Sequence, residues 1–438
     1  MVKLKLHWQI LIALLTAIIA ATIVKSVIGD TSSFTSGLVS TCEFFGKKIF
    51  MGLLKMIVVP LIVPSIICGM IGLGKESHFG RLGLKTLCYY MTSGLVAILT
   101  GLVLVNTIKP GIVDKATASK ILAQQKDPTE FMAKVEGKSS SDITDIFVRM
   151  IPTNVYDAVS DNSKLLGVIF FSILFGFFAS RLPDDLRRAQ QTFWESFLQI
   201  MMKMTDWVIR FSPVGVFCLI TPIIIATGTD AIAPLLKFFV TVILALGIHA
   251  FVTLPIVLKL FGLNPFMHIK AGSPALLMAF STASSASTLP VTMETVEKRA
   301  GVSKRVSSFT LPLGATVNMD GTALYECVVV IFIAQFYAVS SGIALTFGTQ
   351  FEIVLLALLT SVGVAGIPSA SLVAIALILG VVGLPIEAVG IVLVVDRILD
   401  MCRTSVNVFS DTCGAAIIAR TEGESNLYEN INDVGLAK

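Results

Sequence analysis

The sequence predicts an all-α integral membrane protein. Of its 438 residues, 55% are hydrophobic and only 14% are charged, and the mean hydropathy is +0.85. Soluble domains usually carry about 25% charged residues. Apolar runs of about 20 residues, the length that an α-helix needs to cross a bilayer, recur along the chain, and they do not alternate as barrel strands would. The seven cysteines show no metal-binding or disulfide spacing, so we expect small buried side chains.

The expected spans are regular in the first part of the chain and interrupted in the second. The regular apolar runs cover residues 8–28, 49–73, 84–108, 165–179, 196–226 and 235–260. The later runs, at 274–290, 309–337, 351–382 and 384–419, are cut by glycine, serine, proline and charged residues. No cleavable signal segment is expected, because the first run is too long and no small-residue cleavage site closes it.

The placement of lysine and arginine predicts a cytoplasmic N-terminus. Basic residues precede the first span and follow the second span, the fourth span and the 274–290 segment, whereas segments 226–236 and 338–350 hold none. Cytoplasmic loops carry such an excess. Segment 109–139 holds six lysines, but long loops escape this rule, so we expect it to be an extracellular loop.

Segment 395–411 places ionisable groups where they are expensive. On a helix with about 100° per residue, one stripe about 80° wide holds Asp396, Asp400, Arg403, Asn407 and Asp411, and Arg397 falls outside it. Each charge near the bilayer centre costs several kcal/mol unless it is paired or hydrated. A purely structural salt-bridge network is one alternative. Three aspartates facing one arginine favour a transport or ion pathway.

Three nearby segments combine apolar arms with glycine, proline and hydroxyl residues. Residues 311–326 place Pro312, Gly314 and Gly321 around Asn318 and Asp320, which predicts a helix broken in mid-membrane. Unwound carbonyls and a carboxylate suit a hard cation. Residues 279–290 and 361–372 predict the tips of two segments that enter the membrane and turn back. Helix packing through small residues is the alternative for either tip alone.

The chain also resembles a known family. The resemblance rests on NMDGT at 318–322, the Ser-rich tip at 281–288, AGIP at 365–368 and DRILDMCRTSVNVFSD at 396–411. These motifs resemble the glutamate transporter family, the dicarboxylate/amino acid:cation symporters, over essentially the whole chain. The resemblance implies a homotrimer in the lipid bilayer, with eight transmembrane helices and two re-entrant helical hairpins per subunit. A transport domain would slide against a fixed scaffold domain, as in an elevator.

The resemblance also implies domain boundaries and a location. Scaffold helices 1–2 would occupy residues 1–75, transport-domain helix 3 residues 76–110, and the extracellular loop with scaffold helices 4–5 residues 111–225. Helix 6, hairpin 1, helix 7, hairpin 2 and helix 8 of the transport domain would occupy residues 226–425, and a cytoplasmic tail residues 426–438. The protein would be a multi-pass protein of the cell (inner) membrane with both termini in the cytoplasm.

The family's substrate-binding roles map onto this chain residue by residue. Asp400 matches the aspartate that holds the substrate amino group, and Arg403 matches the arginine that pairs with the side-chain carboxylate of aspartate or glutamate. A guanidinium offers a planar fork to a carboxylate, so this role fits the chemistry. The other implied substrate contacts are Ser285, Thr322, Ile367, Ser371, Thr404 and Asn407.

The resemblance implies three sites for co-transported Na⁺. The first comprises Gly314, Asn318, Asn407 and Asp411; the second comprises Tyr89, Thr92, Ser93, Asn318 and Asp320; the third comprises Thr316, Met319, Ser361, Val362 and Val364. We expect sodium to bind first and neutralise the carboxylates, after which the second tip closes over the substrate.

Specificity can be argued within the family. Neutral amino acid members lack the arginine at 403, dicarboxylate members lack the aspartate at 400, and proton-coupled bacterial members tend to have asparagine at 411. This chain has Arg403, Asp400 and Asp411, which favours sodium-driven uptake of aspartate or glutamate. Ala283 and Met401 stand where archaeal and animal members, respectively, carry an arginine, so Asp400 is expected to have one fewer cationic neighbour. Ser371 replaces a family glycine.

Alternative functions differ in what they require. A proton-coupled symporter of C4-dicarboxylates, or of a broader range of amino acids, would work without sodium. An intramembrane aspartyl protease using Asp320 and Asp400 would need two facing carboxylates and a GxGD-type motif, which NMDGT is not. A pure anion channel would conduct without accumulating substrate. The sequence therefore predicts a transporter of a small molecule rather than an enzyme, and nothing in it suggests nucleic acid.

Overall fold

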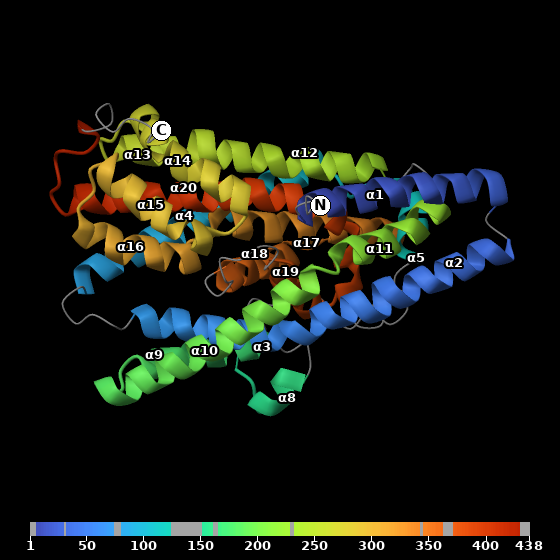
Figure 1. The fold of residues 1–438 in the computed structure, drawn as a ribbon, viewed down its shortest axis with the longest axis horizontal. Helices are drawn as coiled ribbons and strands as arrows, with labels where there is room; N and C mark the ends of the chain where they lie inside the picture. Colours follow the sequence, from blue (N-terminus) through green and yellow to red (C-terminus); the bar gives the residue numbers. More distant parts are fainter. Residues whose placement is uncertain are drawn as a thin grey trace, which may run out of the picture.

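The computed structural model describes residues 6–29, 32–73, 80–123, 151–160, 165–227, 232–341, 345–361 and 371–429. Within these ranges the regular structure is helical and no strand occurs. Many of the helices run along the long axis of an elongated bundle (Figure 1). This agrees with the all-α prediction.

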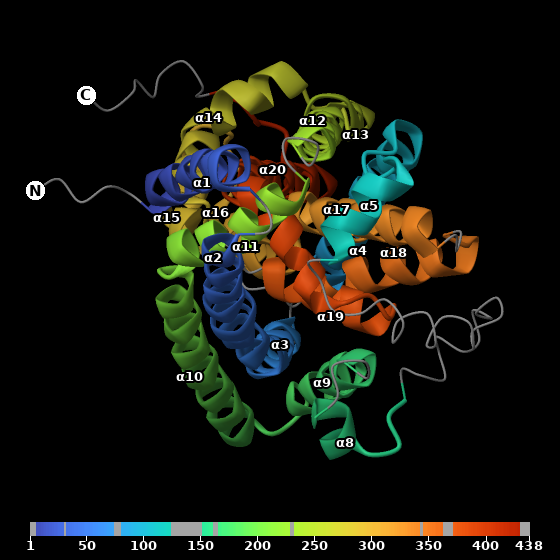
Figure 2. The same cartoon turned by 90° about the vertical axis from the view of Figure 1, so that its right-hand side faces the viewer.

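The first group of helices packs along one side of the bundle. It comprises α1 (Leu6–Ile23) with the π-helix η1 (Val24–Ile28), then α2 (Ser33–Glu43), the π-helix η2 (Phe44–Phe50), α3 (Met51–Leu73), α8 (Val155–Ser160), α9 (Leu165–Ala179), α10 (Asp184–Ile209) and α11 (Ser212–Thr227). α1 packs on α11, while α3 packs on α9 and α10 (Figure 2).

The second group surrounds a buried central helix, α17. It comprises α4 (Gly80–Ile108), α5 (Lys115–Ala123), α12 (Ile232–Ile248), the π-helix η5 (His249–Thr253), α13 (Leu254–Leu260), α14 (Pro265–Thr282), α15 (Ser285–Lys298), α16 (Lys304–Val317), α17 (Asp320–Ser341), α18 (Phe347–Ser361), α19 (Ser371–Val381), the 3₁₀-helix η6 (Ile386–Ile391) and α20 (Leu393–Thr421). α4, α18 and α20 pack directly on α17.

Two expected spans have different boundaries in the structure. The span expected from residue 49 begins at Ser33, because Ser32 caps a helix that runs on through η2 into α3; its hydroxyl accepts a hydrogen bond from the Thr35 amide (3.1 Å). The expected run 196–226 is two helices, which separate at Arg210 and Phe211. Arg210, Ser212 and Pro213 mark this turn in the sequence, and the apolar character of the long run around them concealed it.

The first predicted tip is a tight turn between α14 and α15. Ala283 adopts a left-handed conformation (φ 51°), and the Ser284 hydroxyl accepts a hydrogen bond from the Ser287 amide (3.2 Å), which caps α15. The two helices pack on each other on either side of this turn. The second predicted tip is flanked by α18 and α19, but its residues 362–370 lie outside the described ranges.

The predicted break in residues 311–326 lies at Asn318 and Met319. α16 ends at Val317 and α17 begins at Asp320, so only two residues separate the helices. The helix continues through Pro312, which shows that proline alone does not set the break.

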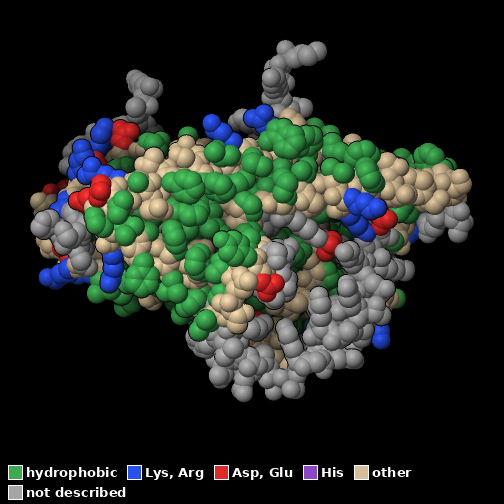
Figure 3. Space-filling view, turned by 90° about the horizontal axis from the view of Figure 1, so that it is seen from below, with side chains coloured by type: hydrophobic (Ala, Val, Ile, Leu, Met, Phe, Trp, Pro, Cys, Tyr) green, Lys and Arg blue, Asp and Glu red, His purple; other side chains and the backbone are tan. Residues whose placement is uncertain are grey.

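Three helical stretches of the described chain are long and apolar enough to cross a membrane: Arg81–Ile108, Ile232–Leu260 and Lys304–Ser340. Hydrophobic side chains cover much of the face in Figure 3, and Lys and Arg gather at its left-hand end. At the end of α20, Glu422 is paired with Lys85 (2.6 Å) and lies 3.7 Å from Arg305. The hydrogen bond from Lys85 holds the pKa of Glu422 below its usual value. These contacts tie the ends of α4, α16 and α20 together.

Replacing Gly321 by alanine should destabilise the protein. An added Cβ would lie 2.6 Å from the Arg403 carbonyl oxygen and 3.0 Å from its Cα, where α17 crosses α20. Such overpacking costs about 1–3 kcal/mol, which should lower the melting temperature of the detergent-purified protein. Gly247→Ala is the matched control, because an added Cβ there has open space. Equal melting temperatures for the two variants would contradict this packing.

Candidate functional site

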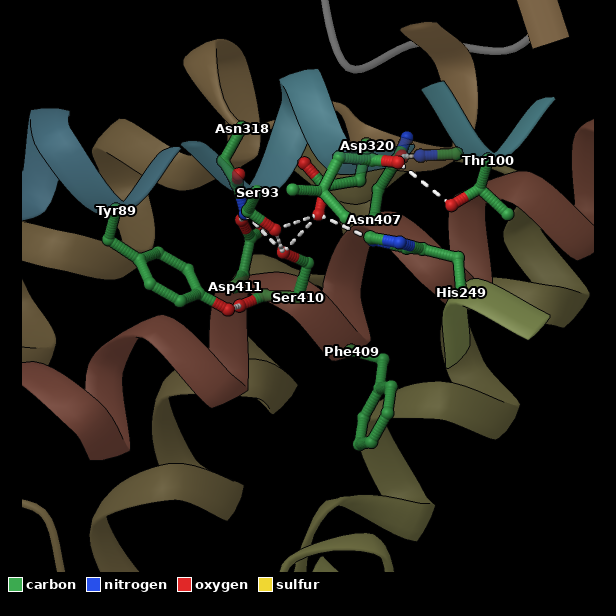
Figure 4. Close-up of polar contacts among 12 residues, drawn as sticks. Tyr89, Ser93, Thr100, His249, Asn318, Asp320, Asn407, Phe409, Ser410 and Asp411 are labelled. Atoms are coloured by element: carbon green, nitrogen blue, oxygen red, sulfur yellow. Dashed lines mark hydrogen bonds and ion pairs between the residues drawn. The ribbon is translucent and has the colours of Figure 1, made fainter. Parts of the chain in front are cut away.

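Asp320, the first residue of α17, lies at the centre of a buried polar cluster (Figure 4). Its Oδ2 accepts hydrogen bonds from the hydroxyls of Ser93 and of Ser410, the latter at 2.7 Å. The same oxygen lies 2.9 Å from Nε2 of His249. All four side chains belong to residues that are at most 8% exposed. Oδ1 of Asp320 has no hydrogen-bond partner among the described residues, so one carboxylate oxygen is available to a further ligand.

Asn318, at the break between α16 and α17, joins this aspartate to a second one. Its amide nitrogen donates to Ser410 Oγ (3.0 Å) and to Asp411 Oδ1 (2.9 Å). Its amide oxygen is buried and has no partner in the described part of the chain. Two orphaned oxygens, on Asn318 and Asp320, thus lie in one cluster, although buried polar atoms are nearly always hydrogen-bonded.

Gly314 lies against the Asp411 side of the same cluster. An added Cβ at this position would overlap the Asp411 carboxylate and would approach the Tyr90 hydroxyl to 2.8 Å. The Gly314 carbonyl accepts a hydrogen bond from the backbone amide of Asn318 (2.9 Å). Glycine is therefore required here for backbone and carboxylate to approach each other.

Asn407 of α20 holds the start of α17. Its side-chain oxygen accepts hydrogen bonds from the backbone amides of Gly321 (2.7 Å) and Thr322 (3.3 Å), and its nitrogen donates to the Thr322 hydroxyl (3.0 Å). The first amides of a helix have no partner within the helix. The side-chain oxygen of Asn407 thus supplies the acceptor that these two backbone amides lack within the helix.

The first part of the predicted stripe forms a separate ion cluster with Arg397, so that the cluster consists of Asp396, Arg397, Asp400 and Arg403. Arg403, 1% exposed, donates from Nη1 to Asp396 (3.0 Å) and from Nε and Nη2 to Asp400 (3.1 and 2.9 Å). Its guanidinium also lies 4.1 Å from the ring centroid of Tyr325, in the range of a cation–π contact.

The expectation that three aspartates face a single arginine is wrong for this part of the stripe. Arg397 lies outside the stripe by angle, as predicted, but its Nη1 lies 3.4 Å from Asp400 Oδ2. Residues three apart are neighbours on a helix surface, and the long arginine side chain spans the remaining angle. Asp396 and Asp400 therefore have arginine partners, and the carboxylates of this cluster do not outnumber the cations.

Several other predicted residues are buried. Thr404 lies on α20, Ser285 begins α15, Ser371 begins α19, Met319 lies at the break and Ser361 ends α18. The Ser371 hydroxyl has no partner among the described residues. The Tyr89 hydroxyl donates to the Ser410 carbonyl at 3.3 Å.

Two predicted residues do not join the cluster. Thr92 is exposed on α4, because the neighbouring Ser93 points to Asp320 and successive helical side chains diverge by about 100°. Thr316 is also exposed, and its hydroxyl donates to the Leu313 carbonyl of its own helix (3.0 Å). The predicted positions Ile367, Val362 and Val364 lie outside the described residues.

The sequence reasoning missed four contributors to these clusters. Ser410 precedes Asp411 on the same helix, and Asp396 was seen on the stripe but was given no role. His249 is a histidine in an apolar span, where the π-helix η5 begins; such π segments are frequent at functional sites. Tyr90 donates to the Thr310 carbonyl (2.7 Å) next to Gly314. Asp396 on the polar stripe and the histidine in an apolar span were signals that could have been followed.

A known protein family matches the chain over nearly its whole length. The model of the sodium:dicarboxylate symporter family matches residues 6–421. The chain belongs to this family. The predicted family resemblance is therefore confirmed over nearly the whole chain.

Individual relatives within the family are similar along most of their length. The chain is 35% identical over 424 residues to the proton/glutamate-aspartate symporter of Escherichia coli (strain K12), covering 96% of this chain and 94% of that protein. It is 34% identical over 425 residues to the proton/sodium-glutamate symport protein of Geobacillus stearothermophilus (97% and 96%). It is 35% identical over 420 residues to excitatory amino acid transporter 2 of Homo sapiens (85% and 72%).

Replacing Ser410 by alanine should weaken cation binding at the Asp320 cluster. Its hydroxyl contacts Asp320, Asn318 and Ser93, and leaving buried partners unpaired costs about 1–3 kcal/mol. We expect the sodium concentration for half-maximal ligand binding to rise about tenfold. Ser405→Ala is the matched control on the same helix, because Ser405 donates to the Leu276 carbonyl instead. If both variants need the same sodium concentration for half-maximal binding, Ser410 is not part of the site.

Proposed function

We propose that this family member is a secondary active symporter that takes up an acidic amino acid, aspartate or glutamate, with the sodium gradient as driving force. The observation that carries the proposal is that α20 bears a buried arginine–aspartate pair and, about two turns further on, Ser410 and Asp411. These two residues join Asn318 and Asp320 in the oxygen-rich cluster. One helix therefore links a zwitterion-binding chemistry to a cation-binding chemistry.

The substrate class follows from the pair of opposite charges. Arg403 offers a planar fork to a carboxylate, and Asp400 offers an acceptor to an ammonium group. Thr322 and Asn407 add a hydroxyl and an amide that are already held in place by each other at 3.0 Å. The relatives named as glutamate and aspartate symporters support this choice. Ser285, Ser371, Thr404 and Ile367 are proposed to complete the pocket.

Sodium as the coupling ion is supported by the unpaired oxygens. The side-chain oxygens of Asn318 and Asp320 that have no partner in the described chain are the hard donors that Na⁺ takes at broken helices in transporters. Asp411, Asn407 and the Gly314 carbonyl lie beside them. We retain Tyr89, Ser93, Met319 and Ser361 as proposed cation contacts, with Val362 and Val364 as further candidates. Thr92 and Thr316 would need to change exposure to take part.

The proposed architecture is a trimeric elevator of eight spans and two re-entrant hairpins. It is supported by the two helix groups. Within the boundaries given above, α1–α3 and α8–α11 would be the scaffold, α5 would belong to the extracellular loop, and α4 and α12–α20 would be the transport domain. The turn between α14 and α15 would be the first hairpin tip. The basic residues gathered near Glu422 favour a cytoplasmic location for that end of the molecule.

Proton coupling is the second candidate. It is favoured by the buried contact between His249 and Asp320, since an imidazole and a carboxylate in contact can share a proton, and by relatives named as proton symporters. The protease alternative is disfavoured, because Asp320 is bonded to serines and histidine while Asp400 is bonded to arginines. The family consists of symporters, which supports a function other than catalysis.

Uptake of labelled aspartate into proteoliposomes tests the coupling ion. We expect accumulation with an inward sodium gradient alone, and no accumulation with a proton gradient alone. Glutamate should compete, whereas serine and succinate should not. Accumulation driven by protons without sodium would show proton coupling instead. An anion current without accumulation would identify a channel.

Replacing Arg403 by cysteine should shift specificity toward neutral amino acids. Loss of the guanidinium leaves the side-chain carboxylate of the substrate without its partner in the protein. We expect aspartate uptake to fall at least 100-fold, which corresponds to about 2.7 kcal/mol. Serine uptake should become measurable under the same sodium gradient. Unchanged selectivity for aspartate over serine would refute the assigned role of Arg403.

A further inference from the structure

Arg397, which has no part in the proposed function, contacts Asp400, a proposed substrate-binding residue. Its Nη1 lies 3.4 Å from Oδ2 of Asp400, and its side chain is only 14% exposed. Its Nε is buried and has no partner among the described residues. The other oxygen of Asp400, Oδ1, takes both hydrogen bonds from Arg403. Each carboxylate oxygen of Asp400 thus faces a different guanidinium.

Arg397 also balances the charge of the ion cluster. Asp396 and Asp400 contribute two negative charges, and Arg397 and Arg403 contribute two positive charges. The neighbouring buried acid, Glu326, accepts a hydrogen bond from Thr360 instead (2.7 Å). Without Arg397 two carboxylates would share one guanidinium. An uncompensated buried charge is strongly unfavourable, most of all inside a membrane.

We propose that Arg397 is a positioning residue that takes the place of the substrate's ammonium group on Asp400 when the transporter is empty. This inference rests on the proposed function. The substrate ammonium would replace the guanidinium at Asp400 Oδ2, and Arg397 would return when the substrate leaves. The exchange is one cation for another at the same oxygen, so Asp400 keeps a cationic partner in both states.

Two consequences follow from this internal cation. Arg397 competes with the substrate for Asp400, so it lowers substrate affinity. It also keeps the empty cluster neutral, so the empty transporter crosses the membrane without a counter-transported cation such as potassium. Neither Ala283, at the first tip, nor Met401 on α20 carries a charge that could act in its place.

The test compares net uptake with exchange in Arg397→Gln. Net uptake of labelled aspartate under a sodium gradient requires the empty transporter to return, whereas exchange against internal unlabelled aspartate does not. Potassium is omitted on both sides of the proteoliposome membrane. We expect net uptake to fall at least tenfold while exchange stays within twofold, and the aspartate Kd to decrease. A residue with only a structural role would slow both modes together and would weaken binding.

Matched variants keep the test decisive. Arg397→Lys should retain the wild-type ratio of net uptake to exchange, because it keeps the charge. The double variant Asp396→Asn/Arg397→Gln removes one charge of each sign and should also retain the ratio, even if the single variant cannot be purified. Arg420→Gln, in the exposed last turn of α20, is the control for the loss of an arginine.

The outcomes separate this inference from the proposed function. A wild-type ratio in Arg397→Gln, or a lowered ratio in the charge-balanced double variant, overturns the role of Arg397 while leaving aspartate symport intact. A wild-type protein that neither takes up nor exchanges aspartate with sodium overturns the proposed function itself.

Discussion

The rest of the site depends on the hydrogen bonds between the Asn407 side chain and the start of α17. A helix broken in the interior exposes amides that hydrocarbon cannot satisfy. Asn407 accepts from two of these amides and donates to the adjacent threonine hydroxyl. The break can therefore persist next to α20, and it leaves Asn318 and Asp320 facing the polar side of that helix. Without this contact, α16 and α17 would continue as one helix, and the side chains of Asn318 and Asp320 would point in other directions.

The polar groups of α20 fall into two clusters with different chemistry. The first, around Arg403, is held by ion pairs and an aromatic ring, and its charges are balanced. The second, around Asp320 and Asp411, contains carboxylates bonded by hydroxyl, amide and imidazole groups but by no arginine or lysine of the described chain. The first cluster is suited to exchange one ion pair for another, and the second is suited to accept a metal ion or a proton. Both clusters include residues of one helix, about two turns apart.

Sequence alone predicted the helical class, the break near NMDGT, the first tip and the polar stripe, because each depends on local composition or on helical period. It failed where a tertiary contact decides the outcome. Arg397 lies outside the stripe by angle but reaches Asp400 through its length, and Thr92 lies one residue from Ser93 yet faces away. His249 could be noticed as the one histidine in the predicted span 235–260, but its partner is 71 positions away. The boundaries of α2 and α10 were missed because a cap and a turn, rather than hydropathy, define them.

The uninterrupted helix formed by α2, η2 and α3 has a consequence for the surrounding lipid. Its three parts contain 11, 7 and 23 residues, which at about 1.5 Å per residue gives a rod of about 60 Å. The hydrocarbon core of a bilayer is only about 30 Å thick. The rod must lean steeply, project into water, or deform the bilayer around it, and each response carries an energy that varies with acyl-chain length. Membrane thickness therefore enters the conformational energetics of this protein as a variable in its own right.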